Sequence, residues 1–323
     1  MEFNFSGISG DPIDQEPIST KILILGSGPA GLSAALYAAR ADLAPIVLTG
    51  MELGGQVSLT HIVENYPGFP EGVGGNELVE HFQKQAERFG AKLEFDSATE
   101  VDLSRRPFNV KSYNSTYLAD TLIITTGATP RHLNIPGETE LTGRGVSYCA
   151  TCDGWFFKDK DLIVVGGGDS AIEEGLFLTR YAKSVKIVHR RDELRAGQIL
   201  QNRARSNPKI DFAWNTIITS INGNGSVESV SYKDTITENT GQMDIDGVFI
   251  FIGHIPNTQL FENQLKMDEK GYLSVSPLMQ TNVPGVFAAG EVADSHFRQV
   301  ITSAGMGAAA AIQAGHFLDE MTT

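Results

Sequence analysis

The sequence has few cysteines, few basic residues for its length and no long apolar run. Only two of its 323 residues are cysteine, and 25 lysines and arginines stand against 39 aspartates and glutamates, a formal net charge of −14. This charge repels nucleic-acid backbones and anionic lipid surfaces. No apolar stretch approaches the length of a transmembrane helix, and the acidic opening Met1–Pro17 lacks the basic and apolar regions of a signal peptide. The sequence therefore predicts a cytoplasmic protein that binds neither nucleic acid nor membrane.

The two cysteines stand close together, in the order Cys149-Ala150-Thr151-Cys152. A zinc site needs four ligands, and the sequence offers neither a second such pair nor closely spaced histidines, so no metal site is expected. Two sulfurs at this spacing can cycle between dithiol and disulfide, and a turn or helix N-terminus favours the attacking thiolate. Asp153 follows directly, where a carboxylate can shuttle a proton in this exchange. On position alone, a helix cap or an exposed turn is the commoner role for such an aspartate.

One local pattern occurs twice, an aliphatic run followed by a glycine turn and a helix rich in small residues. Lys21–Leu25 leads into Gly26-Ser27-Gly28-Pro29-Ala30-Gly31, and Asp161–Val165 leads into Gly166-Gly167-Gly168-Asp169-Ser170-Ala171. The first glycine permits a tight turn, the second lets a phosphate approach the backbone, and the third position needs a very small side chain for packing. A single motif of this kind is weak evidence. Two in the same strand, turn and helix context predict two dinucleotide-binding sites.

The length of the chain suits two domains. A second repeat supports this, because Asp120–Gly127 resembles Asp246–Gly253, and each closes one nucleotide-binding half. A last strand that ends in glycine, Gly285–Glu291, is assigned to the first domain. The sequence therefore predicts an α/β fold of two Rossmann-like, three-layer nucleotide-binding domains, with the second inserted into the first. The expected boundaries are an N-terminal extension over 1–20, a first domain over 21–129 and 258–323, and a second over 130–257.

A basic cluster follows the second strand of the second unit, Val185–Val188. An acidic residue there would bind the ribose 2′-hydroxyl of NAD, whereas guanidinium groups suit the 2′-phosphate of NADP. Charge runs are usually solvated faces, but this one stands at a functional offset in an acidic protein, so NADPH is favoured. The predicted NADPH-binding residues are Gly166, Gly168, Asp169, Ser170, Ala171, His189, Arg190, Arg191 and Arg195.

The first unit has Thr49-Gly50 where an acidic residue would stand, with Glu52 slightly later, so this position alone does not identify its nucleotide. The chemistry of the cysteine pair is more informative. Nicotinamide delivers two electrons as hydride, whereas a disulfide accepts them one sulfur at a time, and a flavin joins these two chemistries. FAD is therefore the best occupant of the first site.

Further motifs occur in order along the chain and carry a resemblance to a known family. The motifs concerned are Gly26–Gly31, Gly54-Gly55-Gln56, Val63-Glu64-Asn65-Tyr66-Pro67-Gly68, Cys149-Ala150-Thr151-Cys152-Asp153-Gly154, Gly166–Ala171, His189–Ala196, Gly285–Glu291 and Arg298-Gln299-Val300-Ile301-Thr302-Ser303-Ala304-Gly305. With these motifs, the chain resembles the low-molecular-weight, bacterial-type thioredoxin reductases over essentially its whole length after about residue 20.

The resemblance implies a homodimer whose FAD domain is split around an NADPH domain, with thioredoxin as substrate. It implies that Cys152 takes electrons from the flavin, that Cys149 attacks the thioredoxin disulfide, and that Asp153 is the acid–base group. One departure is Glu291, where the family usually has aspartate. The implied FAD-binding residues are Gly26, Gly28, Pro29, Ala30, Gly31, Thr49, Gly50, Gly55, Gln56, Asn65, Thr126, Gly127, Gly290, Glu291, Arg298, Gln299 and Val300.

The cysteine pair and the NADPH fingerprint lie in one predicted domain, yet both must reach a flavin held by the other. This predicts two docked arrangements of the domains, related by a hinge near Ala128–His132 and Pro256–Thr258.

Other functions share parts of this pattern. A ferredoxin-dependent thioredoxin reductase or an oxygen-using dithiol oxidase would keep the cysteines but lack a nicotinamide site, and Arg190, Arg191 and Arg195 argue against both. A non-enzymatic redox sensor that binds NADP remains an alternative from a different class, although two full nucleotide sites exceed what a sensor needs.

Overall fold

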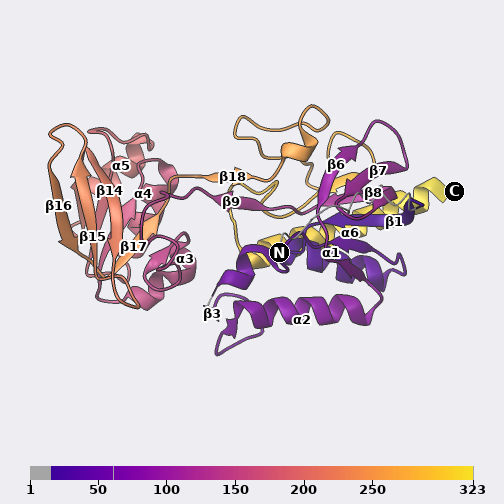
Figure 1. The fold of residues 1–323 in the computed structure, drawn as a ribbon, viewed down its shortest axis with the longest axis horizontal. Helices are drawn as coiled ribbons and strands as arrows, with labels where there is room; N and C mark the ends of the chain where they lie inside the picture. Colours follow the sequence, from indigo (N-terminus) through magenta and orange to yellow (C-terminus); the bar gives the residue numbers. More distant parts are fainter. Residues whose placement is uncertain (1–15, 61, 323) are drawn as a thin grey trace, which may run out of the picture. The chain divides into compact units, whose positions relative to one another are not determined.

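The computed structural model describes residues 16–60 and 62–322, which form two compact units (Figure 1). The first unit takes in the described residues up to Leu59, Asn76–Gly127 and those from Pro256 onward. The second takes in the described residues of Thr60–Gly75 together with Ala128–Ile255. Most of the predicted extension 1–20 lies outside the described residues.

A seven-stranded sheet organises the first unit, in the order β5-β2-β1-β8-β7-β6, with β19 also paired to β8. Strands β1, β2, β5, β8 and β19 run parallel, whereas β6, β7 and β8 form an antiparallel run. The bounds are β1 Ile18–Leu25, β2 Ile46–Leu48, β5 Lys92–Glu94, β6 Ala98–Asp102, β7 Phe108–Ser112, β8 Thr116–Ile124 and β19 Val286–Ala288. The helices are α1 Pro29–Arg40, α2 Gly75–Arg88 and α6 Val300–Thr322, with single turns η1 Gly55–Leu59 and η3 Gln259–Phe261.

The first strand begins at Ile18, three residues before the predicted run Lys21–Leu25. Its early residues pair with the start of β8, Ile18 with Tyr117 and Thr20 with Ala119. These early residues are only partly apolar, so the hydrophobic pattern does not predict them as strand. Backbone pairing with β8 extends the strand to Ile18.

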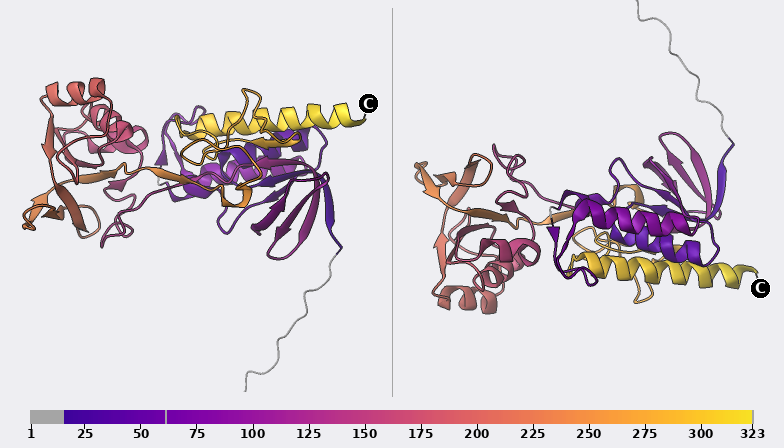
Figure 2. Two further views of the ribbon diagram at one scale, coloured as in Figure 1. Left: turned by 90° about the horizontal axis from the view of Figure 1, so that it is seen from above. Right: turned by 90° about the horizontal axis from the view of Figure 1, so that it is seen from below.

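Both faces of this sheet are covered, because side chains alternate along each strand. On β1, Ile22 and Ile24 face the small-residue helices α1 and α6, while Leu23 and Leu25 face the opposite core. All four are almost completely buried. Figures 1 and 2 show α1, α2 and α6 lying together on one face. The other face is closed by the β6–β8 run and by the segment around Phe261.

The second unit has the same layered plan around a parallel sheet in the order β10-β17-β11-β12-β13. Leu162 and Val164 on β11 face the helices, while Ile163 and Val165 face a three-stranded antiparallel sheet. The strands are β10 Val146–Ser147, β11 Asp161–Val165, β12 Ser184–Val188, β13 Ile210–Ala213, β14 Thr216–Asn222, β15 Ser229–Asp234, β16 Thr240–Asp244 and β17 Gly247–Ile250. The helices are α3 Ala150–Asp153, α4 Asp169–Leu178 and α5 Gln198–Ser206, with a single turn η2 Gly154–Phe157.

Two short pairings complete the fold. Two of the places where the chain passes between the units, at 127–128 and 255–256, lie in a pair of strands, β9 Ala128–Pro130 and β18 His254–Pro256. A hairpin of β3 Ile62–Val63 and β4 Val73–Gly74 is closed by its own hydrogen bonds. Its segment groups with the second unit, whereas the predicted boundaries place it within 21–129. No helix of the described residues is long and apolar enough to cross a membrane.

The close packing of α1 against α6 leads to a prediction about the stability of the first unit. A Cβ added at Gly307 would lie 2.0 Å from the Ala30 carbonyl oxygen, whereas one at Gly315 would meet only Leu43, at 3.5 Å. We expect Gly307→Ala to lower the free energy of unfolding by about 1–3 kcal/mol, because the two helix backbones must separate. Gly315→Ala, in the same helix, should be neutral or stabilising by up to about 1 kcal/mol. Denaturant unfolding followed by circular dichroism measures both, and equal effects of the two variants would contradict the packing argument.

Candidate functional site

The cysteine pair lies at the start of a single helical turn in the second unit. Cys149 and Cys152 form a disulfide, with their Cα atoms 5.3 Å apart. Cys149 is the N-cap of α3 in an extended conformation, and its sulfur accepts a hydrogen bond from the Cys152 backbone N–H at 3.2 Å. A donor aimed at this sulfur stabilises negative charge on it, so the local fold favours a Cys149 thiolate after reduction.

Asp153 ends the same turn and is partly buried. Burial raises the pKa of its carboxyl above the ordinary value, and a hydrogen bond from the buried Ser147 hydroxyl opposes this rise. A carboxyl with a raised pKa holds a proton closer to neutral pH, as a general acid or base must. Asp153 therefore lies next to the pair with a raised pKa, and its acid–base role stays a prediction.

A hydrogen-bond cluster around the buried carboxylate of Glu138 fixes the chain just before the pair. Tyr148 donates to the Glu138 carboxylate at 2.7 Å, and its oxygen also contacts Nδ1 of His132 at 2.8 Å. Glu138, 2% exposed, further accepts from the backbone N–H groups of Leu133 and Asn134. The pKa of the Tyr148 hydroxyl is raised, first by burial and then by this carboxylate. The sequence did not reveal this cluster.

Two large side chains beside the pair are exposed. Trp155 and Phe156 have 56% and 50% of their surfaces exposed, whereas the neighbouring Phe157 packs against Phe249 with ring centroids 5.1 Å apart. Exposed aromatic surface of this kind is typical of protein-docking sites. The sequence left Trp155 without a role, because aromatic identity alone does not distinguish core from surface.

The second glycine turn joins β11 to α4 and supports the basic cluster. A Cβ at Gly166 would lie 2.5 Å from the Phe251 carbonyl oxygen, so a side chain is excluded there, whereas Gly168 has open space. The Gly167 carbonyl accepts from Arg195 N–H at 2.7 Å. Asp169, predicted as a nucleotide contact, accepts from Gly197 N–H at 2.7 Å and thereby holds the end of the basic loop against α4.

The basic side chains themselves are exposed. Arg190, Arg191 and Arg195 form no ion pair within the described part of the chain, despite the acidic composition of the protein. His189 is buried against Gly167, and burial followed by the charge of Arg195 lowers the pKa of its imidazole. The cluster therefore offers uncompensated positive charge, which suits a phosphate group.

The first glycine turn joins β1 to α1 in the same way. A Cβ at Gly26 would lie 2.4 Å from the Thr125 carbonyl oxygen, and one at Gly31 would lie 1.9 Å from the Gly26 carbonyl oxygen. Gly28, the N-cap of α1, has open space around it. Backbone N–H groups at such a turn are therefore accessible to a phosphate. The cradle fits a dinucleotide such as FAD.

Most of the other residues implied for FAD lie in this unit. Thr49 and Gly50 follow β2, Gly55 and Gln56 stand in η1, and Thr126 and Gly127 follow β8. Pro29 and Ala30 begin α1, and a Cβ at Gly290 would lie 2.9 Å from that of Ala30, so the structure brings the first turn and the last motif together. The implied contact that the structure does not bring into this unit is Asn65, which belongs to the segment grouped with the second unit.

Glu291 follows Gly290 and faces a mixed environment. Its carboxylate oxygen lies 3.5 Å from the Gln56 amide nitrogen, a long hydrogen bond. Burial raises the pKa of Glu291 to about 7; Arg298 lowers it and Asp294 raises it further. Asp294 is itself fixed by the backbone N–H groups of His296 and Phe297, just before α6. Gln299 and Val300 continue from Arg298 into that helix.

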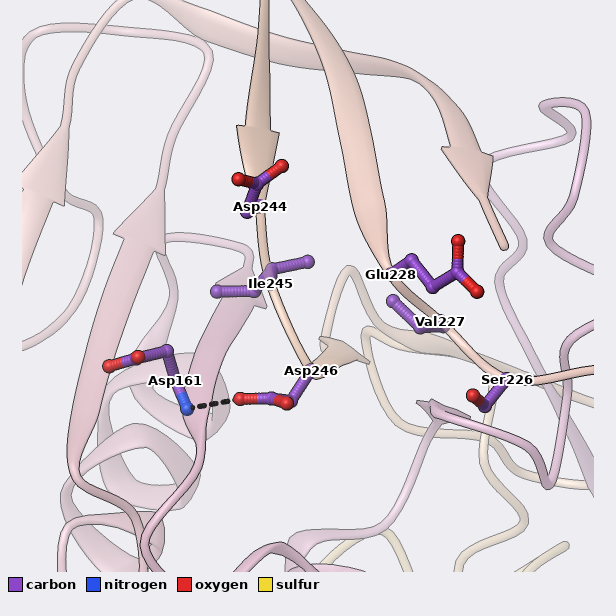
Figure 3. Close-up of a pocket in the computed structure, with 7 residues that line it drawn as sticks. All are labelled: Asp161, Ser226, Val227, Glu228, Asp244, Ile245 and Asp246. Carbon is purple, nitrogen blue, oxygen red and sulfur yellow. Dashed lines mark hydrogen bonds between the residues drawn. The ribbon is translucent and has the colours of Figure 1, made fainter. Parts of the chain in front are cut away.

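A separate pocket of about 410 Å³ lies at the edge of the second unit (Figure 3). Acidic side chains dominate its lining, and they link the strands: Asp246 accepts from Asp161 N–H at 2.9 Å, and Asp161 pairs with Lys183 at 2.8 Å. The pocket contains none of the predicted site residues, and its charge disfavours phosphate. Among the described residues no group of three or more His, Cys, Asp or Glu side chains is placed to hold a metal ion. The residues that line the pocket are Asp161, Ser226, Val227, Glu228, Asp244, Ile245 and Asp246.

A disulfide in the same unit as a glycine turn with a basic cluster, and a second glycine turn in the other unit, define the class of the protein. The chain belongs to the pyridine nucleotide-disulphide oxidoreductase family, whose sequence pattern matches residues 20–315. Within this family it is similar to the thioredoxin reductase of Streptomyces clavuligerus, which is 50% identical over 300 residues, 92% of this chain and 93% of that protein.

Solved structures of thioredoxin reductases are similar to this chain as well. The thioredoxin reductase of Streptococcus pyogenes superposes with a TM-score of 0.90 at 41% identity, over 94% of this chain and 100% of that one. The thioredoxin reductase of Lactococcus lactis in its FR conformation is 40% identical and gives a TM-score of 0.64, over 93% and 99% of the two chains. The resemblance stated from the motifs and the predicted α/β fold with two Rossmann-like domains are thereby confirmed.

The raised pKa of Glu291 predicts a pH dependence of stability. Below its ordinary pKa of 4.5 the carboxyl is protonated whether the chain is folded or not, whereas above about pH 7 it must ionise in a site that disfavours the charge. We expect the FAD-free protein to lose stability as the pH rises between these values, and Glu291→Gln to reduce that loss. Urea unfolding across this range measures the effect. Glu262→Gln, which removes an exposed glutamate of the same unit, is the matched control, and an unchanged slope in Glu291→Gln would refute the assignment.

Proposed function

We propose that this protein is a thioredoxin reductase, a flavoenzyme that uses NADPH to reduce the disulfide of thioredoxin through Cys149 and Cys152. The observation that carries the proposal is the Cys149–Cys152 disulfide, which lies in one unit with an exposed arginine cluster at a glycine turn. The relatives and solved structures most similar to the chain bear this name.

FAD is proposed for the turn at Gly26, Gly28 and Gly31, where Gly26 and Gly31 let the backbone pack tightly and the open space at Gly28 leaves room for a pyrophosphate. Thr49, Gly50, Gln56 and Glu291 would line the rest of the site, with the other residues named above. When bound, FAD converts the hydride equivalent of NADPH into electrons that a disulfide accepts. The carboxylate of Glu291 would accept a hydrogen bond from a ribityl hydroxyl of FAD, at a position where the family usually has aspartate.

NADPH is proposed for the turn at Gly166 and Gly168, with Arg190, Arg191 and Arg195 on the 2′-phosphate. Support comes from the exposure of these guanidinium groups and from the way Gly167 and Asp169 hold the loop that carries them. His189 is buried behind the turn and fills the space under Gly167, and this burial lowers the pKa of its imidazole.

The dithiol exchange proceeds in two displacements. The Cys149 thiolate attacks one sulfur of the thioredoxin disulfide, forming a mixed disulfide and releasing the other sulfur as a thiolate, which takes a proton. Cys152 then attacks the Cys149 sulfur, re-forms the internal disulfide and releases the second thioredoxin thiol. Asp153 supplies and removes the protons. Trp155 and Phe156 offer the apolar surface on which thioredoxin would dock.

Alternation between two arrangements of the units completes the proposal, because one unit carries both the dithiol and the basic nucleotide turn. The strand β9 lies within the first predicted hinge segment, Ala128–His132, and its partner β18 ends at Pro256, where the second segment, Pro256–Thr258, begins. A solved relative is described as being in an FR conformation. From the family resemblance we also propose a cytoplasmic homodimer.

Anaerobic reduction tests the electron path. NADPH should bleach the flavin absorbance of the purified protein, and oxidised thioredoxin should restore it. Cys149→Ser should keep the bleaching and lose the recovery, because the attacking sulfur is absent. Bleaching without recovery in the unaltered protein would exclude thioredoxin as the acceptor, and failure to bleach would exclude NADPH in favour of a donor such as ferredoxin. Bound flavin with no turnover of any disulfide would favour a redox sensor.

Exchange of the arginines tests the nucleotide. A hydrogen bond to a charged group contributes about 1.5–3 kcal/mol, so Arg190→Gln or Arg191→Gln should raise the KM for NADPH roughly ten- to a hundredfold. The KM for NADH, which lacks the 2′-phosphate, should change little. Arg144→Gln, another exposed arginine of the same unit, is the matched control. Equal losses with both nucleotides would contradict the phosphate assignment.

A further inference from the structure

The two sulfurs of the disulfide have different surroundings. The Cys149 sulfur accepts a hydrogen bond from the Cys152 backbone N–H at 3.2 Å and lies 3.4 Å from the hydroxyl oxygen of Thr151. The Cys152 sulfur has no hydrogen-bond partner within residues 16–60 and 62–322. Polar hydrogens of the protein therefore converge on one sulfur of the pair.

The Thr151 hydroxyl is the donor in its contact with Cys149. A disulfide sulfur carries no hydrogen, and Cys149 is bonded to Cys152, so only the hydroxyl can supply one. Thr151 is the second residue of α3 and is exposed. Its branched Cβ restricts the hydroxyl to few orientations. Nothing in the exchange chemistry described above uses this side chain.

Backbone hydrogen bonds hold Thr151 and Cys149 in this relation. Cys149 is the N-cap of α3, and its carbonyl accepts from the Asp153 N–H at 3.1 Å. On the other side, the Cys149 N–H donates to the Ser147 hydroxyl at 3.1 Å, and Ser147 pairs with Phe249 in the sheet. None of these bonds involves a sulfur. The hydroxyl therefore stays beside the Cys149 sulfur when the S–S bond is broken.

Reduction makes this contact stronger at one sulfur. Two electrons and one proton break the S–S bond and leave one sulfur as a thiolate and the other as a thiol. In the proposed function the electrons come from NADPH. A hydrogen bond to an ionised acceptor is stronger than one to a neutral acceptor. The two donors at Cys149 therefore favour the thiolate there and the proton on Cys152.

We propose that Thr151 assigns the thiolate to Cys149, by donating its hydroxyl hydrogen to that sulfur after reduction. The sulfur that attacks the thioredoxin disulfide is then selected within the pair, before thioredoxin binds. The consequence for catalysis rests on the proposed function, in which Cys149 makes the first displacement. The hydrogen bond itself can be tested without thioredoxin.

Charged side chains near the turn do not replace this hydrogen bond. Asp153 lies in α3 itself, and the elements that pack most closely against α3 are η2 and α4. The turn η2 carries no charged residue. Tyr148, the residue before Cys149, donates to the Glu138 carboxylate. When ionised, all of these carboxyl groups oppose a thiolate. Those of α4 are Asp169, Glu173 and Glu174.

The experiment uses the fact that the protein has only two cysteines. Cys152→Ser leaves Cys149 as the sole thiol, and the rate at which iodoacetamide alkylates this FAD-loaded variant follows its thiolate fraction. The rate is measured across pH by mass spectrometry. Adding Thr151→Val, which removes the hydroxyl but keeps the shape, should lower the rate about three- to tenfold below the midpoint of the profile. The midpoint should move to higher pH, and the two rates should converge at high pH.

Two controls separate the hydrogen bond from a structural effect. Thr151→Ser keeps a hydroxyl and should retain the profile of Cys149. In the reciprocal Cys149→Ser protein, where Cys152 is the sole thiol, Thr151→Val should leave the profile in place. An unmoved Cys149 profile in Thr151→Val would overturn the proposal. Equal shifts at both thiols, or equal shifts with Ser and Val, would also overturn it, because they would show a disturbed turn.

A single turnover then distinguishes a failure of this inference from a failure of the proposed function. Holoenzyme with both cysteines is reduced with one equivalent of NADPH, mixed with oxidised thioredoxin and quenched with acid, and the free thiols of thioredoxin are counted. Thr151→Val should slow transfer at low pH and much less at high pH. If the unaltered enzyme fails to reduce thioredoxin while the Cys149 profile moves, the function is wrong and the role of Thr151 stands. If transfer occurs and the profile does not move, the function stands and the role of Thr151 is refuted.

Discussion

Contact between a glycine and the end of a neighbouring strand determines where each nucleotide site can form. Gly26 lies against the Thr125 carbonyl and Gly166 against the Phe251 carbonyl, in both cases too close for any side chain. This contact turns the chain sharply from the central strand into α1 or α4, with the helix N-terminus at the carboxyl edge of the sheet. Phosphates are bound at such an edge. The basic loop, the last motif at Gly290 and the dithiol turn are all placed relative to sheets fixed in this way.

The residues near the two glycine turns differ in charge. The protein as a whole is strongly acidic, yet the loop after β12 exposes three arginines that no described carboxylate neutralises. The turn after β1 has no such cluster. The residue that follows Gly290, which lies against α1, is the carboxylic acid Glu291. One fold used twice therefore differs in charge at its two turns, and the arginines that make the difference lie in a few residues beyond β12.

Patterns along the chain were sufficient to predict the two Rossmann-like domains, the two glycine turns and the redox pair, because each depends on residues close in sequence. The strand β11 and the helices α1 and α4 begin and end as the aliphatic runs and small residues indicate. Contacts between side chains and distant or irregular backbone were not visible. Asp169 bonded to Gly197, Glu138 bonded to Tyr148, and Ser147 bonded to the dithiol turn obey no periodicity. Exposure of Trp155 likewise depends on packing that sequence does not encode locally.

The route of the chain also has a consequence for the order in which the protein is made. Strand β19 and helix α6 belong to the first unit but follow the whole of Ala128–Ile255 in the chain. During synthesis the second unit, nearly continuous in sequence, is complete while the first still lacks one strand and the helix that covers α1. Because domains fold as units when their sequence is available, the N-terminal half of the protein must wait for its C-terminal end. The unit that starts first on the ribosome therefore finishes last, and its small-residue helix α1 stays uncovered in the interval.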